Sequence, residues 1–156
     1  VANYWIKEFL LSDFKTTSKA GTKRLAVALR SAISQTDDLT VKHELTSSAV
    51  LAKNLKGKNL SIDEFYAQYH LSTEAIRIVD KQLNSSRLAE DKFLFDLDEF
   101  TKHLSYKTLE IDNGAILTAP LDKFDDCFTE EVLGESNIHT FLTKGKVINE
   151  KLKKTK

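Results

Sequence analysis

The sequence predicts an α+β fold, with an N-terminal helical layer followed by a small antiparallel β-sheet that contains an Asn-Gly hairpin. Apolar residues recur every three or four positions through most of residues 1–90, which is a helical period. After Lys92 the pattern changes toward strand-like alternation, and the Asn113-Gly114 pair lies within it. Helices that precede an antiparallel sheet along the chain are the order of an α+β protein.

The composition is that of one globular domain. The chain has 156 residues, of which 41% are hydrophobic, so it can bury a core without a disulfide or metal scaffold. Its single cysteine, Cys127, cannot form an internal disulfide, and no apolar run approaches the roughly 20 residues of a membrane-spanning helix. We expect a cytoplasmic single domain over residues 1–156, mainly helical over 1–90 and mixed over 91–156. The absence of methionine favours a C-terminal fragment of a longer protein.

Three helices are expected in the first 56 residues. Aromatic and leucine side chains share one face of Tyr4–Leu11. In Thr17–Gln35, leucine and isoleucine recur every four residues opposite a basic face. The third helix begins at caps around Asp38 and runs to about Lys56, where a glycine follows.

Capping signals place three more short helices. Ser61 and Glu64 form a capping box, and the residues at the staple positions are Leu60 and Phe65. A helix is expected to open at Ser72 or Thr73 and to run to Leu83, before the Asn-Ser-Ser segment 84–86. From Lys92 a short strand should enter a short helix capped by Asp96.

The Asn-Gly pair predicts a hairpin over Thr108–Thr118. A two-residue type I′ turn suits Asn113-Gly114 and would set Ile111 opposite Ile116.

The stretch beyond Pro120 is expected to be an acidic loop, Asp122–Glu135. Two further strands, Asn137–Thr143 and Lys146–Leu152, would then turn about Lys144-Gly145.

The net charge is zero, with 23 basic and 23 acidic side chains, which excludes a uniformly basic DNA-coating protein. The charges are unevenly distributed, however. Residues 1–86 carry 12 basic and 9 acidic side chains (+3), residues 87–136 carry 5 and 13 (−8), and residues 137–156 carry 6 and 1 (+5). Such asymmetry indicates either a partner surface or ordinary solvated faces.

The basic residues define two candidate phosphate-binding groups. The first group is the lysine tail, with Lys144, Lys146, Lys151, Lys153, Lys154 and Lys156. The second is the basic face of the Thr17–Gln35 helix, with Lys19, Lys23, Arg24 and Arg30. If all six tail lysines contacted phosphates, log K would fall with log salt with a slope of about −5. Lysines alone carry no base readout, so such binding would be directed to the DNA backbone. The alternative is a frayed, solubilising tail.

Signals for catalysis are weak. The four histidines lack the paired spacing of a zinc site, and no glycine-rich phosphate loop is present. The acidic residues Asp122, Asp125, Asp126, Glu130 and Glu131 lack the EF-hand pattern, and solvation explains them better than a divalent cation does. We therefore expect no cofactor, no metal and no enzymatic activity.

The order of these features resembles the C-terminal half of bacterial nucleoid-associated proteins of the NdpA/YejK type. The resemblance spans most of the chain. It rests on Tyr4-Trp5-Ile6 with Phe9-Leu10, the helix containing Thr22-Lys23, the Leu-Ser-x-x-Glu-Phe entry at 60–65, the segment 93–100, Ile111-Asp112-Asn113-Gly114, and the closing Thr140–Leu152.

The resemblance implies a non-enzymatic protein of the bacterial nucleoid. It would bind double-stranded DNA without sequence preference and contact a DNA-handling enzyme such as a type II topoisomerase. The zero net charge departs from what an autonomous DNA binder would show, so this part of the chain would also supply oligomerisation or partner contacts.

Two other function classes remain open. In a protein–protein interaction module, the −8 segment would engage a basic partner. In a metal-dependent nuclease, the carboxylates of Asp122–Glu131 would hold the metal.

Overall fold

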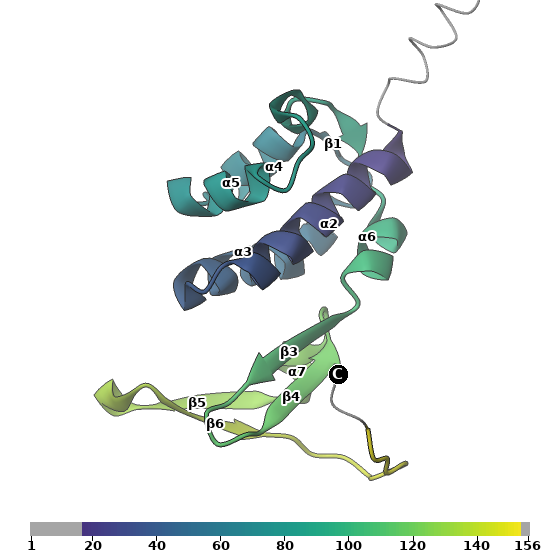
Figure 1. The fold of residues 1–156 in the computed structure, drawn as a ribbon. Helices are drawn as coiled ribbons and strands as arrows, with labels where there is room; N and C mark the ends of the chain where they lie inside the picture. The colour runs from purple at the N-terminus through teal and green to yellow at the C-terminus, as the bar shows by residue number, and fades with distance from the viewer. Residues whose placement is uncertain (1–16, 154–156) are drawn as a thin grey trace, which may run out of the picture. The chain divides into compact units, whose positions relative to one another are not determined.

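The computed structural model describes residues 17–153, and the chain forms two compact units that divide after Lys107 (Figure 1). Each unit is described by itself. The expected helix at Tyr4–Leu11 lies outside the described residues.

Helix α2 (Ser18–Gln35) lies against α3, α5, α6 and β2 in the first unit (Figure 1). It begins as expected at Thr17, whose hydroxyl accepts a hydrogen bond from the Ala20 N–H at 3.1 Å. Leu25 and Leu29 are fully buried on its apolar face. Gly21 lies on that face as well, because a Cβ there would lie 2.5 Å from the Cβ of Phe93.

Helix α3 (Leu39–Leu51) starts at Asp38, whose carboxylate accepts from the backbone N–H of Thr40 at 2.9 Å. Its α-helical hydrogen bonding ends at Leu51, earlier than the expected Lys56, and a 3₁₀ turn, η1 (Ala52–Leu55), completes the segment. Tightening of the last turn into 3₁₀ geometry is common at helix ends.

Two short helices, α4 (Ile62–Gln68) and α5 (Thr73–Asp80), follow with serine caps. Ser61 accepts from the Glu64 N–H at 3.1 Å, and Ser72 accepts from the Ala75 N–H at 3.2 Å. The prediction that the second helix extends to Leu83 is wrong, because the chain leaves α-helical geometry after Asp80 through two i→i+3 turns.

A two-stranded antiparallel ladder flanks this helix pair in sequence. Strand β1 (Asn59–Leu60) precedes α4, and β2 (Phe93–Leu94) follows α5 and a 3₁₀ turn, η2 (Ser86–Ala89). Helix α6 (Leu97–His103) then begins at the expected cap, where the Asp96 carboxylate accepts from the Glu99 N–H at 3.1 Å.

The core of the first unit is built from all of these elements. Its largest fully buried side chains are Thr22, Leu25, Leu29, Leu45, Ile62, Phe65 and Val79. The buried Thr22 hydroxyl accepts from the Asp96 N–H at 3.0 Å, so α2 contributes directly to the position where α6 starts.

The expected hairpin is formed by β3 (Tyr106–Glu110) and β4 (Ile116–Pro120), and all but the first two residues of β3 belong to the second unit. Its turn differs from the prediction. Ile111 donates to the Ala115 carbonyl at 2.9 Å and its own carbonyl accepts from the Gly114 N–H at 3.0 Å, so the loop has three residues. Gly114 has φ +93°, whereas Asn113 does not have the positive φ that a type I′ turn needs. Ile111 is therefore paired with Ala115 and not with Ile116.

The segment expected to be an acidic loop is in fact folded. It contains α7 (Phe124–Cys127) and β5 (Thr129–Leu133), followed by a 3₁₀ turn, η3 (Gly134–Ser136). Strand β6 (Ile138–Leu142) confirms the expected strand at 137–143, but its antiparallel partner is β5.

The expected last strand, Lys146–Leu152, is absent from the structure. Residues 143–153 have no regular secondary structure, and the exposed fractions of Val147 and Ile148 are 90% and 95%. Lys144-Gly145 is accordingly no hairpin turn.

The α+β class is confirmed, because the helices precede most of the strand residues and, within residues 17–153, every sheet has two antiparallel strands. Among residues 17–153, no helix has both the length and the apolar character needed to cross a bilayer.

Candidate nucleic-acid interface

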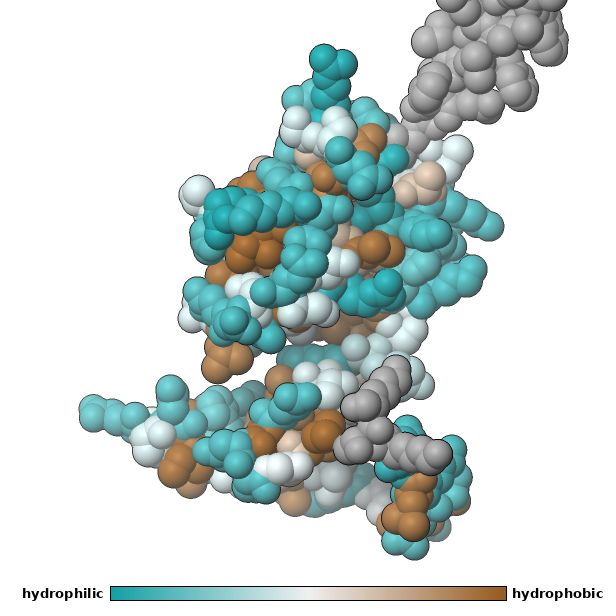
Figure 2. Space-filling model, in the orientation of Figure 1, coloured by the Kyte–Doolittle hydropathy of each residue, from teal (hydrophilic) through white to brown (hydrophobic). Residues whose placement is uncertain are grey.

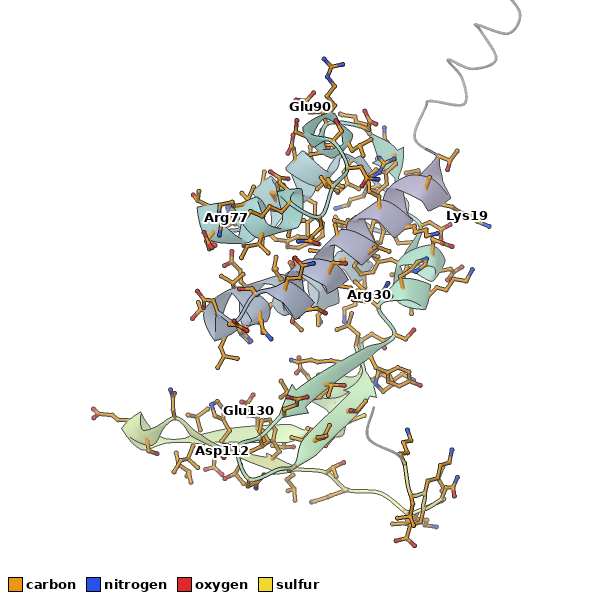
Figure 3. All side chains as sticks on the ribbon, viewed as in Figure 1. Lys19, Arg30, Arg77, Glu90, Asp112 and Glu130 are labelled. Carbon is orange, nitrogen blue, oxygen red and sulfur yellow. The ribbon has the colours of Figure 1, made fainter. Side chains whose placement is uncertain are left out.

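The basic residues of α2 divide into two groups in the structure. Lys19, Lys23 and Arg30 are separated by four and seven residues, so they share one exposed face of the helix; Lys19 and Arg30 are labelled in Figure 3. Arg24 lies off that face, half-buried, with its guanidinium 3.9 Å from the Asp91 carboxylate. The structure therefore brings together three of the four predicted residues.

Arg30 also has a structural contact. Its guanidinium donates to the backbone carbonyl of His103 at 3.2 Å, at the end of α6. A cation at this position is stabilised by the negative end of the α6 dipole. Arg30 is thereby held in place, so of this group Lys19 and Lys23 are the better candidates for contacts with a phosphate backbone.

The lysine tail lies in the second unit. Lys144, Lys146, Lys151 and Lys153 are all exposed on the irregular segment after β6, and Lys154 and Lys156 lie outside the described residues. Glu150 is the one acidic residue among them. A basic segment without regular secondary structure can follow the phosphates of a duplex without a matching surface shape.

The acidic segment does not converge on one point. Asp125 and Asp126 belong to α7, while Glu130 and Glu131 are consecutive residues of β5 and so project to opposite faces of the ribbon. Glu130 lies beside His139, with its carboxylate 2.6 Å from the imidazole Nδ1. Within residues 17–153 no three His, Cys, Asp or Glu side chains are grouped as a metal site would require.

The shifted pKa values of the first unit gather around α4 and α5. Burial, together with the hydrogen bond that Tyr66 donates to Asp80 at 2.7 Å, raises the pKa of the Tyr66 phenol. Partial burial, and to a lesser extent the charges of Asp80 and Glu90, raise the pKa of Asp63. The Tyr66–Asp80 hydrogen bond joins α4 to the end of α5, so these two side chains have a structural role.

The sequence interpretation missed an exposed row on α5. Thr73, Arg77 and Lys81 follow one another at intervals of four residues on the side away from buried Ala75 and Val79, and Arg77 is labelled in Figure 3. The sequence did contain a signal for the tight helical pair to which this row belongs, because the two serine-capped helices are separated by only four residues.

The second unit also exposes apolar side chains. Leu133, Ile138 and Leu142 project from one face of the β5–β6 ribbon, and their exposed fractions are 50%, 57% and 54%. Figure 2 shows brown, apolar surface over this unit.

Comparisons with protein-family models, with curated proteins and with solved structures produced no match to this chain.

Proposed function

We propose that this chain is a non-enzymatic, nucleoid-associated protein that binds the backbone of double-stranded DNA without sequence preference. The observation that carries the proposal is the exposed lysine tail after β6, with Lys19, Lys23 and Arg30 of α2 as a second basic face. The resemblance to nucleoid-associated proteins of the NdpA/YejK type points in the same direction.

The tail has the chemistry for this role. Each ammonium group attracts phosphate and displaces a condensed counterion, so affinity depends strongly on salt. A lysine offers no planar fork that would distinguish one base pair from another. The tail therefore supplies affinity in proportion to the number of phosphates that it contacts.

A salt titration tests the tail directly. The four described lysines 144, 146, 151 and 153 are changed together to glutamine, and binding to a mixed-sequence duplex is followed by fluorescence anisotropy. We expect the slope of log K against log salt to become shallower by about 3 to 4.

A charge-matched control separates the tail from net charge. The control variant changes four exposed lysines from elsewhere in the chain to glutamine, namely Lys53, Lys56, Lys58 and Lys123. We expect this variant to keep a slope within about 1 of the original protein. Equal losses in the two variants would mean that the tail is not the binding element.

A second candidate function, self-association or docking to a DNA-handling protein, is favoured by the apolar face of the β5–β6 ribbon. Leu133, Ile138 and Leu142 are about half exposed there, and clustered apolar side chains on a surface commonly mark a protein interface. A type II topoisomerase is one partner that the family resemblance suggests.

Sedimentation velocity tests the self-association form of this alternative. We expect changing Leu133 and Ile138 to serine to shift a dimer toward monomer, whereas changing the exposed Leu39 of α3 to serine should have no effect. A chain that sediments as a monomer at every concentration would leave docking to another protein as the remaining form, to be tested with a purified topoisomerase.

A further inference from the structure

Helices α4 and α5 are joined by a short turn of the kind found in a helix-turn-helix. The turn, Tyr69–Ser72, has four residues, which is the length found in such motifs. His70 within it has φ +50°, the left-handed conformation that glycine often supplies in these turns. Leu71 is buried and holds the turn against the core.

The second helix of this pair is firmly positioned. The carboxylate of Glu44, on α3, accepts from the Ser72 hydroxyl at 2.9 Å and from the Ser72 backbone N–H. At the other end of α5, Asp80 accepts the hydrogen bond of the buried Tyr66 hydroxyl. Both ends of α5 are therefore anchored to neighbouring helices, which limits how far its exposed face can move.

The exposed face of α5 carries chemical groups of the types that can bind base edges. Thr73 has a hydroxyl and Glu74 a carboxylate in the first turn of the helix, Arg77 has a guanidinium one turn further along, and all three side chains are exposed. In DNA-binding helix-turn-helix proteins, the N-terminal residues of the second helix contact the bases. Arginine pairs with guanine through two hydrogen bonds, and a carboxylate accepts from the amino group of cytosine.

The free protein keeps these groups paired with each other. Arg77 donates from Nε to Glu74 at 2.9 Å, a contact that lowers the pKa of Glu74 and holds both side chains over the exposed face. Since both partners are exposed, the pair can open to meet bases at small cost.

The net charge of the segment that contains α4 and α5 is zero. Residues 56–92 carry six basic and six acidic side chains, so this element has little long-range attraction for DNA. It would act on a duplex already attracted by the lysine tail, and the inference therefore rests on the proposed function.

We infer that α4 and α5 form a DNA-reading helix-turn-helix that places α5 in the major groove, where Thr73, Glu74 and Arg77 add a preference among base pairs to the sequence-independent backbone binding by the tail. The tail then supplies affinity and α5 supplies selectivity, which is the usual division between phosphate and base contacts.

Selection from a pool of duplexes with a randomised central segment tests this inference. We expect one sequence family to be enriched by the full chain. On the enriched duplex, Arg77→Ala and Arg77→Lys should each weaken binding by about tenfold or more, because both lose the guanidinium fork. On a mixed-sequence duplex, Arg77→Lys should bind as the original protein does.

Controls keep this outcome separate from that of the tail. Lys56→Ala, an exposed change outside α5, should bind both duplexes normally. Absence of an enriched sequence, or full binding of the enriched duplex by Arg77→Lys, would overturn the helix-turn-helix while leaving backbone binding intact. Failure of the original protein to bind any duplex would overturn both proposals.

Discussion

Gly21 shows how one residue reverses an expectation drawn from helix propensity. In the interior of an exposed helix, Gly→Ala stabilises by about 1 kcal/mol. In α2, however, the added methyl group would lie 2.5 Å from the Cβ of Phe93, an atom fixed to the backbone of β2. We expect Gly21→Ala to lower the free energy of unfolding by about 1 to 3 kcal/mol, measured by urea denaturation.

A second glycine supplies the matched control. Nothing lies within 4 Å of the position that a Cβ would take at Gly145, so Gly145→Ala should change stability by less than about 0.5 kcal/mol. A stabilised Gly21→Ala variant would show that α2 and β2 are separated in solution.

Tyr66 makes the free energy of unfolding depend on pH in the alkaline range. Its hydroxyl is buried against Asp80, so Tyr66→Phe leaves that half-buried carboxylate without this donor and should cost about 1 to 3 kcal/mol near pH 7. Because the folded-state pKa of Tyr66 lies above its usual 10.0, the folded chain retains the proton that the unfolded chain loses. This contribution is therefore fully present below pH 10 and declines as the pH rises further.

Urea unfolding at several pH values measures the effect. The gap in stability between the original protein and Tyr66→Phe should narrow above pH 10. A gap that stays constant up to pH 11 would mean that Tyr66 ionises equally in both states.

At the scale of elements, local signals predicted the helices of the first unit well. The caps at Ser61, Ser72 and Asp96 are formed by residues three positions from their partners, so the sequence contains both halves of each interaction. The β3–β4 turn was predicted one residue out of register, because the choice between a two-residue and a three-residue loop depends on pairing along both strands.

The hairpin turn offers a direct test of that register. Gly114→Ala places a side chain at φ +93° and should cost about 1 kcal/mol, with faster hydrogen exchange at the Ile111 amide. The control is Asn113→Asp, which keeps the side-chain oxygen that accepts from the Ala115 N–H at 2.9 Å; it should cost less, because Asn113 does not adopt a positive φ. Equal costs at both positions would instead indicate the type I′ turn.

Strand β5 and the tail show where element prediction failed. Glu130 and Glu131 lower the intrinsic strand preference of 129–133, yet the segment pairs with β6 along its whole length. The opposite holds for Val147 and Ile148. These residues favour strands by composition, yet they lie in a segment without regular structure. In both segments, whether a strand formed was decided by the presence or absence of a pairing strand. A single sequence does not show which segments will pair.

For the whole molecule, the candidate interface was only partly predictable. Exposed lysines follow from composition alone, and the four tail lysines that the structure describes are exposed, although the strand expected at 146–152 is not formed. The roles of Arg24 and Arg30 depend on Asp91 and His103, which lie 67 and 73 residues away in the sequence, so spacing along α2 could not show that they make structural contacts.

Removal of the tail should leave both compact units folded. Residues 143–153 have no regular structure, so a chain ending at Thr143 should melt within about 2 °C of the original protein by circular dichroism. A chain ending at Asn137 should melt lower, because it also lacks β6, the partner of β5. A large loss of stability in the chain that ends at Thr143 would show that the tail contributes to folding.

The contacts between α2 and the segment around β2 set an order of events during synthesis. The Ser18 hydroxyl donates to the Leu94 carbonyl at 2.6 Å, and that of Thr22 accepts from the Asp96 N–H, across separations of 76 and 74 residues. A ribosome adds about 5–20 residues per second, so α2 emerges roughly 4 to 15 seconds before these partners. During that interval the apolar face of α2 has only its nearer neighbours to cover it, and a nascent chain paused before residue 93 is one that a chaperone would recognise.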